Sequence, residues 1–360
     1  MFVTLQPEKF RWSILALFFI ALIGCTPRSK EETTAGDPPV SPEQTLTVYT
    51  FRNYPNDQHL FRLFEQRSGF KVNVVKGTGE ELSQKLLTEG NSCPASLVIL
   101  PELSLILQLK QKGALQQGQF GKLNLTIPSR YSDPEEFWIG LSKWTPAFAY
   151  SINKVNQQLI GRYVDLANPK WKDKVLTTKG TNLMNQTLVA SMVAVEGPEA
   201  TKNWLTGLVA NMAEPPLDND AAVIQAIAQG KGDIGLINAS SFIQYQRSGS
   251  AEAFKQTEGI GLLYPVSASG GSTYFNLTVA GIPAHAPKPA IALKLLEFMI
   301  DQEVQKLFAE TLYEFPLNPY SVPNDFLIEL GGFKEKEVKF ELIGQHLEQA
   351  KELLQASSWK

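Results

Sequence analysis

The sequence contains little cysteine and histidine, with two cysteines and three histidines among 360 residues. If the chain is exported, Cys93 and Cys25 cannot build a disulfide framework. The three histidines, His59, His285 and His346, are scattered, and neither an HExxH nor a CxxC motif is present. Since zinc sites need closely spaced ligands, this pattern argues against a zinc enzyme.

The sequence also lacks a dominant charge, because 33 basic and 36 acidic residues leave a formal net charge of −3. Interspersed signs of this kind exclude the basic surface that a nucleic-acid-binding protein needs. No nucleophile–base–acid set, phosphate loop or cofactor fingerprint can be assembled, so we do not expect an enzyme. A hydrophobic content of 43% over 360 residues is typical of a globular protein with two domains.

The N-terminus has the pattern of a bacterial export signal. Lys9 and Arg11 precede an apolar run, Ser13 to Gly24, which is shorter than the roughly 20 residues that span a bilayer. The run ends in "LIGC", which resembles the lipoprotein box, so residues 1–25 are expected to be a lipoprotein signal peptide with Cys25 as anchor. The protein would then face the periplasm or cell exterior. The alternative is that Cys25 follows an ordinary signal peptide.

The segment that follows, residues 26–44, is rich in Pro, Thr, Ser and Glu and should form a flexible linker. Beyond it, strand patterns at 46–51, 71–75 and 95–101 alternate with helical patterns. This βαβαβ order predicts an open parallel sheet in an α/β lobe. In such sheets ligands bind beyond the carboxyl ends of the strands.

A long apolar strand pattern from Phe137 to Asn153 is of the kind that crosses from one lobe to another. The α/β alternation then resumes, and a strand over Phe275 to Pro283 returns to the first sheet. We therefore predict lobe 1 over 45–145, lobe 2 over 146–270, and a return to lobe 1 with C-terminal helices over 271–360.

Several stretches resemble the ferric-iron-binding subfamily of ABC-importer periplasmic substrate-binding proteins. They are "LTVYTFRNYPND", "DLANPKWKDKV", "NQTLVASMVAVEG", "GDIGLIN" and "TLYEFPLNP". The resemblance covers Leu46 to about Val322. It implies the type II periplasmic-binding fold, an α/β fold of two lobes with hinge-connected parallel or mixed sheets. It also implies closure around Fe(III) and delivery to a membrane permease driven by an ATPase.

Members of that subfamily hold Fe(III) with tyrosinates, because a hard trivalent cation favours anionic oxygen ligands. Several of the implied ligand positions are changed here. An expected histidine is Asn53, the tyrosine beside it is kept as Tyr54, and Met184 stands where a related branch has tyrosine. A thioether is too soft for a ferric ion.

The most diagnostic pair of ligands, two adjacent tyrosines after "GDIGLIN", corresponds to Ser240 and Ser241. Where the family has an arginine-rich strand that contacts a companion anion, this chain has Trp144 and Pro146. No Tyr-Tyr pair occurs anywhere in the sequence, so a shifted alignment does not restore the site. The serines could cap a helix or donate to a bound oxyanion, and Tyr274 could supply a relocated phenol.

The candidate cleft residues are Asn53, Tyr54, Met184, Ser240, Ser241 and Tyr274, with Tyr54 as the one candidate metal ligand. The nearby Asp218, Asn219 and Asp220 have the pattern of a turn and helix cap. We predict a lipid-anchored substrate-binding component of an ABC importer, which binds Fe(III) weakly or another small solute or oxyanion. The alternative is a lipoprotein that uses this scaffold for interaction or regulation instead of transport.

Overall fold

The computed structural model describes residues 44–52 and 55–360. The predictions for Cys25, Asn53 and Tyr54, and for the signal and linker up to residue 43, lie outside the described residues. Within the described ranges, no helix is both long and apolar enough to cross a bilayer.

The first sheet begins with the predicted βαβαβ unit. Its elements are β1 (Thr45–Thr50), α1 (Pro55–Ser68), β2 (Lys71–Lys76), α2 (Gly79–Glu89) and β3 (Leu97–Leu100), followed by α3 (Leu103–Gln111). β1 lies between β2 and β3 and pairs in parallel with both. Every residue of β3 is buried, as expected for a parallel strand with helices on both faces.

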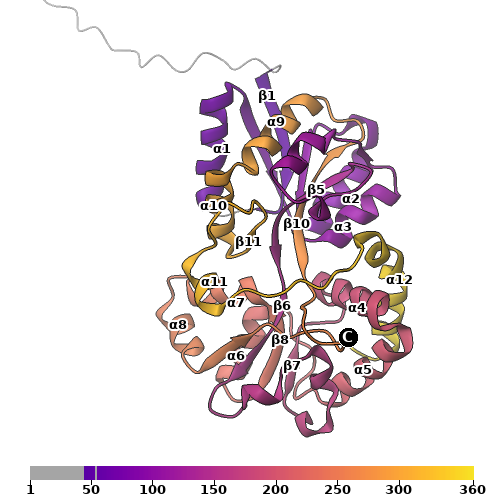
Figure 1. Cartoon of the computed structure of the whole chain (residues 1–360), viewed down its shortest axis with the longest axis vertical. Helices are drawn as coiled ribbons and strands as arrows, with labels where there is room; N and C mark the ends of the chain where they lie inside the picture. The colour runs from indigo at the N-terminus through magenta and orange to yellow at the C-terminus, as the bar shows by residue number, and fades with distance from the viewer. Residues whose placement is uncertain (1–43, 53–54) are drawn as a thin grey trace, which may run out of the picture. The chain divides into compact units, whose positions relative to one another are not determined.

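Antiparallel strands complete this sheet and make it mixed. They are β4 (Leu115–Gln116), β5 (Trp138–Trp144), β10 (Asn276–Pro283) and β11 (Phe315–Pro316). The strand order is β11-β5-β10-β3-β1-β2, with β4 paired to β10. β10 is therefore central although it comes from the second half of the chain (Figure 1).

The second sheet has the order β7-β8-β6-β9. Its strands are β6 (Pro146–Ser151), β7 (Val175–Thr177), β8 (Ile234–Asn238) and β9 (Ile260–Leu263). The helices around it are α4 (Leu183–Glu196), α5 (Pro198–Ala210), α6 (Asp220–Ala228), α7 (Ala239–Gln246) and α8 (Ala251–Thr257).

The apolar stretch 137–153 forms two strands rather than the one long strand that its pattern predicted. β5 belongs to the first sheet and β6 to the second, and the buried Thr145 separates them. The Thr145 hydroxyl donates to the Tyr274 carbonyl at 2.7 Å, just before β10 enters the first sheet. This hydrogen bond joins the two segments that cross between the sheets.

The last helices connect the two halves of the molecule. They are α9 (Pro289–Met299), α10 (Gln302–Leu312), α11 (Asp325–Leu330) and α12 (Phe340–Ala356). At its start, α12 places Phe340 against Trp138 of β5, with ring centroids 5.7 Å apart. Along its length it packs on α3 and α4, so it contacts helices from both sheets (Figure 1).

Beyond α12, Trp359 is buried beside the second sheet. Its indole N–H donates to the Thr178 carbonyl at 2.8 Å, and its ring lies 6.2 Å from that of Trp204. A Cβ at Gly180 would lie only 2.2 Å from the Trp359 carbonyl oxygen. The loop before α4 therefore needs glycine at this point.

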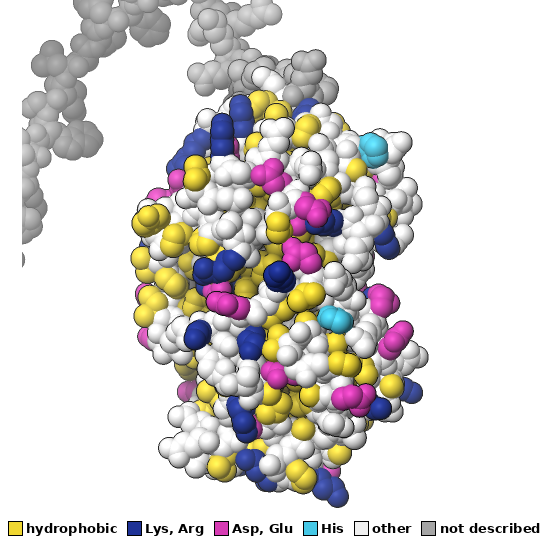
Figure 2. All heavy atoms as spheres, turned by 45° about the vertical axis from the view of Figure 1, so that its right-hand side comes forward, with side chains coloured by type: hydrophobic (Ala, Val, Ile, Leu, Met, Phe, Trp, Pro, Cys, Tyr) yellow, Lys and Arg dark blue, Asp and Glu magenta, His cyan; other side chains and the backbone are white. Residues whose placement is uncertain are grey.

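Charged side chains of both signs are interspersed over the face that Figure 2 shows. This distribution agrees with the mixed charge pattern of the sequence. It offers no broad basic surface on that face for a polyanion.

We expect Trp359→Ala to lower the free energy of unfolding by about 3–5 kcal/mol, the cost of emptying a large buried aromatic site. Urea unfolding followed by circular dichroism measures this change. The matched control is Leu342→Ala on α12, whose exposed side chain should cost less than about 1 kcal/mol. Equal stability losses in the two variants would contradict the prediction that the buried Trp359 ring stabilises the fold.

Candidate functional site

A cavity of about 360 Å³ lies between the two sheets. On the first-sheet side its walls come from the ends of β1, β3 and β5, from α2, and from the end of α10. On the second-sheet side they come from the end of β8 and the N-terminal turns of α4, α6 and α7. The cavity thus lies beyond strand ends, where ligand sites of α/β sheets are expected.

Three of the predicted cleft residues line this cavity: Met184, Ser240 and Ser241. Met184 and Ser240 are buried, and Ser241 is half-buried. Trp144, which replaces an expected arginine, also lines it. Its indole N–H donates to the Pro101 carbonyl at 3.1 Å, so the ring is held in place and its polar atom is already used.

The serines do not cap α7, which corrects one of the two interpretations of this pair. Asn238 is the N-cap residue, and its side chain accepts a hydrogen bond from the Ser240 backbone N–H at 2.9 Å. An asparagine immediately before the helix satisfies the orphan N–H equally well. The two serines follow it inside the first turn.

Tyr274 does not line this cavity. Its ring is buried 5.4 Å from that of Tyr163, and its hydroxyl donates to Glu196 at 3.1 Å. Burial and the Glu196 carboxylate both raise the pKa of the Tyr274 phenol. A phenol that resists ionisation is poorly suited to become a tyrosinate ligand.

Four acidic residues line the cavity, and the sequence had assigned none of them to a ligand site. They are Glu80, Glu102, Asp220 and Glu314. Within the described part of the chain, no lysine, arginine or histidine lines the cavity with them. Two features of the sequence could have pointed to ligand-site residues. Glu102 directly follows β3, and Glu314 lies in the "TLYEFPLNP" stretch.

Glu102 has the most complete hydrogen bonding of the four, and it is only 3% exposed. As N-cap of α3, its Oε2 accepts from the Ser104 backbone N–H at 3.1 Å and from the Ser104 hydroxyl. The Thr187 hydroxyl of α4 donates to the same oxygen at 2.9 Å, and the Asn276 amide of β10 donates to Oε1. Burial raises the pKa of Glu102 from 4.5 to about 7, although these hydrogen bonds oppose the rise.

Glu314 follows α10 and is 5% exposed. Its Oε2 accepts from the Thr278 hydroxyl at 2.9 Å and from the Ser142 hydroxyl. Its Oε1 accepts no hydrogen bond from the described residues. Burial raises the pKa of Glu314 to about 7, and the hydroxyls and the charge of Arg52 oppose this rise.

Asp220 is the first residue of α6, and Asn219 before it is the N-cap, as the sequence pattern predicted. Its Oδ2 accepts from the Asn238 backbone N–H at 3.3 Å. Its Oδ1 is shielded from solvent and has no hydrogen-bond partner among the described residues. Burial raises the pKa of Asp220 to about 6, although hydrogen bonds with Ser241 and the Asn238 N–H lower it.

The helix N-termini around the cavity already use their own caps. Asn182 accepts from the Met184 N–H of α4, as Asn238 and Glu102 do for α7 and α3. Free N–H groups at helix N-termini bind anions, but a capping side chain takes up some of these donors. The acidic residues add negative charge at the same ends.

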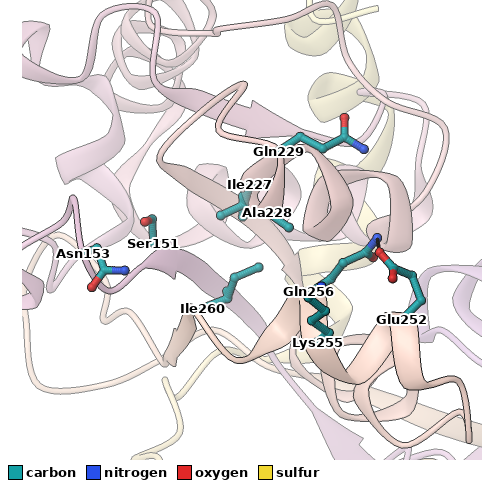
Figure 3. A pocket seen from close by; sticks show the side chains of 10 residues that line it. Ser151, Asn153, Ile227, Ala228, Gln229, Glu252, Lys255, Gln256 and Ile260 are labelled. Atoms are coloured by element: carbon teal, nitrogen blue, oxygen red, sulfur yellow. Dashed lines mark hydrogen bonds between the residues drawn. The ribbon is translucent and has the colours of Figure 1, made fainter.

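The described residues include no group of three or more His, Cys, Asp or Glu side chains arranged to hold a metal ion. A second hollow, of about 460 Å³, lies on the second-sheet side between β6, α6, α8 and β9 (Figure 3). There Gln256 donates to Glu252 at 2.8 Å. Because its lining comes from one sheet and its helices alone, it is a weaker candidate than the cavity between the sheets.

The family profile of bacterial extracellular solute-binding proteins matches residues 60–335 of this chain. The chain belongs to this family. This solute-binding protein is 31% identical over 319 residues to iron uptake protein A2 of Synechocystis, covering 88% of this chain and 90% of the relative. It is 29% identical over 318 residues to iron uptake protein A1 of the same organism, covering 88% of each.

Solved structures give the same assignment. The Trichodesmium protein IdiA (FutA), in complex with iron and citrate ligands, is 32% identical and matches with a TM-score of 0.84. The match covers 88% of this chain and 100% of that one. The fold of this solute-binding protein is therefore the type II periplasmic-binding fold, and the resemblance to the ferric-iron-binding subfamily is confirmed. The relatives are uptake and binding proteins, in agreement with the prediction that the chain is not an enzyme.

The raised pKa of Glu102 makes stability depend on pH. Between pH 4.5 and 7 the unfolded chain loses this proton while the folded protein keeps it, so stability falls as pH rises through this window. We expect Glu102→Gln to reduce this fall by about 1–3 kcal/mol. Urea unfolding at pH 4.5, 5.5, 6.5 and 7.5 measures it. An unchanged pH slope in Glu102→Gln, matching that of the exposed control Glu348→Gln, would contradict the burial argument.

Proposed function

We propose that this protein is the lipid-anchored substrate-binding component of an ABC importer and that the cavity between the sheets binds its solute. The observation that carries the proposal is the cavity itself, because both sheets contribute to it and the crossing strands lie beside it. Such a site can close by a hinge motion when a ligand contacts both sides. A permease and an ATPase would be the partners, and the "LIGC" motif at Cys25 supports the anchor.

In this proposal the iron site of the subfamily is degenerate. Ser240 and Ser241 supply neutral hydroxyls where adjacent phenols would bind Fe(III), and Met184 contributes a thioether beside them. A serine hydroxyl is far less acidic than a phenol and does not yield its proton to a ferric ion in the same way. The buried Tyr274 does not replace them. The ligand set therefore favours a solute other than a ferric ion held by tyrosinates.

Weak iron binding through Tyr54 and exogenous ligands is the second candidate. It is favoured by the relatives in Synechocystis, which are iron uptake proteins, and by the iron and citrate ligands in the Trichodesmium structure. An exogenous ligand would supply the oxygens that this chain lacks. If neither iron nor any solute binds, the interaction or regulatory role remains.

We expect titration of the full-length protein, purified in detergent, with ferric citrate to give no visible tyrosinate-to-iron charge-transfer band. We expect this because the band requires tyrosinate ligands, and this chain lacks the pair of adjacent tyrosines. A band that persists in the exposed-tyrosine control Tyr320→Phe but disappears in Tyr54→Phe would instead establish the second candidate.

Closure around a solute should change the fluorescence of Trp144, because its ring lines the cavity. A panel of small cations, anions and neutral solutes is added to the full-length protein, with thermal shift as a parallel readout. The signal should vanish in Trp144→Phe and remain in Trp204→Phe, whose ring lies against Trp359 instead. Failure of every solute in both readouts would argue against a binding function.

Lipidation predicts that the exported wild-type protein carries a diacylglyceryl group on Cys25 and fractionates with membranes. The Cys25→Ser variant should lack this modification in intact-mass spectrometry and lose its membrane association. Cys93→Ser serves as the control, since Cys93 is the other cysteine and is buried. An unmodified Cys25 in the exported protein would contradict the anchor.

A further inference from the structure

Residues 331–339 form a strap that connects α11 with α12 and contains no helix or strand of its own. In Figure 1 the strap runs across the molecule between these two helices. The helix before it belongs to the second-sheet side, because Leu327 of α11 is buried in the same core as Phe242 of α7. The Arg247 guanidinium also packs over the Phe326 ring of α11 at 3.5 Å. The strap therefore begins at the second sheet.

The middle of the strap is bound to the first-sheet side through Glu335. Its Oε1 accepts from the Tyr131 hydroxyl at 2.6 Å and from the Lys143 ammonium group of β5, and its Oε2 lies 3.4 Å from Arg130 Nε. The Glu335 and Lys143 side chains are only 14% and 19% exposed, so solvent screens this ion pair less than a surface pair. Although burial opposes ionisation, the hydrogen bonds and charges of Lys143, Tyr131 and Arg130 lower the pKa of Glu335. We call these four residues the clamp.

The strap also contacts the segments that cross between the sheets. Thr273, just before β10, donates its N–H to the Lys334 carbonyl at 2.7 Å, and its carbonyl accepts from the strap N–H two residues later at 2.9 Å. The Phe333 ring lies 5.2 Å from that of Phe315 in β11 and 5.5 Å from that of Tyr264, which follows β9. The strap is thus packed against segments of both sheets.

The strap and the cavity lie on opposite faces of β5 and β11. Successive residues of a strand point to opposite faces of a sheet. Trp144 lines the cavity, and Lys143 before it points the other way, to Glu335. Likewise Glu314 lines the cavity, and Phe315 after it packs on the strap. Lys143 and Phe315 are direct partners in the register of β5 and β11, so their side chains share one face.

This placement makes the strap sensitive to closure of the cavity. A hinge motion that brings the two sides of the cavity together moves them apart on the opposite side of the hinge. Between the end of α11 at Leu330 and the clamp at Glu335 the chain is short, and it spans at most roughly 3.3–3.6 Å per residue. Closure therefore stretches this part of the strap and pulls on the clamp, whereas opening relaxes it.

We propose that the strap is a brake on closure of the cavity. The clamp raises the free energy of the closed form, so closure requires the additional contacts of a bound solute. This inference rests on the proposed function, because it concerns closure of the same cavity. It assigns the balance between the open and closed forms to residues that lie outside the cavity.

Double electron–electron resonance tests the brake without any solute. Spin labels are attached at Gln84→Cys on α2 and Asp218→Cys before α6, two exposed positions on opposite sides of the cavity. The full-length protein also carries Cys25→Ser and Cys93→Ser, so that only the new cysteines are labelled. We expect Glu335→Gln to shift the distances toward shorter values and to raise the ratio of closed to open molecules about 10-fold, as for the loss of a charged hydrogen bond.

Two further variants test whether the ion pair itself is responsible. Lys143→Met should also shift the distances toward shorter values. The double variant with Glu335→Gln should change the ratio by less than the product of the two single effects, because both remove the same pair. The matched control is Glu337→Gln, which removes an exposed acid two residues further along the strap and should give the wild-type distances. Circular dichroism and Tm check that each variant is folded.

The outcomes separate the brake from the function on which it rests. A folded Glu335→Gln protein with the wild-type distances overturns the brake, and so does a shift that Glu337→Gln reproduces. If ferric citrate or a solute of the fluorescence panel shortens the distance equally in the wild type and in Glu335→Gln, and the two agree without solute, the binding function stands and the brake fails. If no variant and no solute changes the distance, both proposals fail.

Discussion

The buried carboxyl group of Glu102 is the interaction on which the rest of the site depends. It caps α3, accepts from Asn276 on the central strand β10, and accepts from Thr187 on α4 beside the second sheet. A carboxyl group is costly to bury unless its oxygens are satisfied. The groups that satisfy this one come from both halves of the molecule, so its hydrogen bonds connect the two halves beside the cavity.

The need to satisfy polar groups around the cavity also explains its electrostatic character. Strand ends and helix N-termini converge there, as in other α/β ligand sites. Elsewhere such termini attract anions, but here Asn182 and Asn238 cap two of them, and Glu102 and Asp220 place carboxyl groups at two others. The positive ends of the helices are therefore partly compensated within the protein, which leaves an acidic and partly apolar cavity.

The fold of this chain does not determine which solute its cavity binds. The strand order, the crossing at Thr145 and the match to relatives over 88% of the chain all follow the solute-binding fold. The side chains that meet at the cavity include Ser240, Ser241 and Trp144, and none of these can form a tyrosinate. A fold is compatible with many ligands, so the chemistry of the lining residues has to decide the solute.

The sequence alone determined the α/β class, the βαβαβ start, the family, and the absence of adjacent tyrosines, because local periodicity and short motifs carry this information. Through the family resemblance, it also predicted that Met184, Ser240 and Ser241 lie in one cleft. It did not reveal that the stretch 137–153 divides between two sheets at Thr145, or that Asn238 caps α7. Only the tertiary structure brought together Glu102, Asp220 and Glu314, which are far apart in the chain. Their hydrogen bonding and burial depend on contacts between distant segments, and no local pattern encodes those contacts.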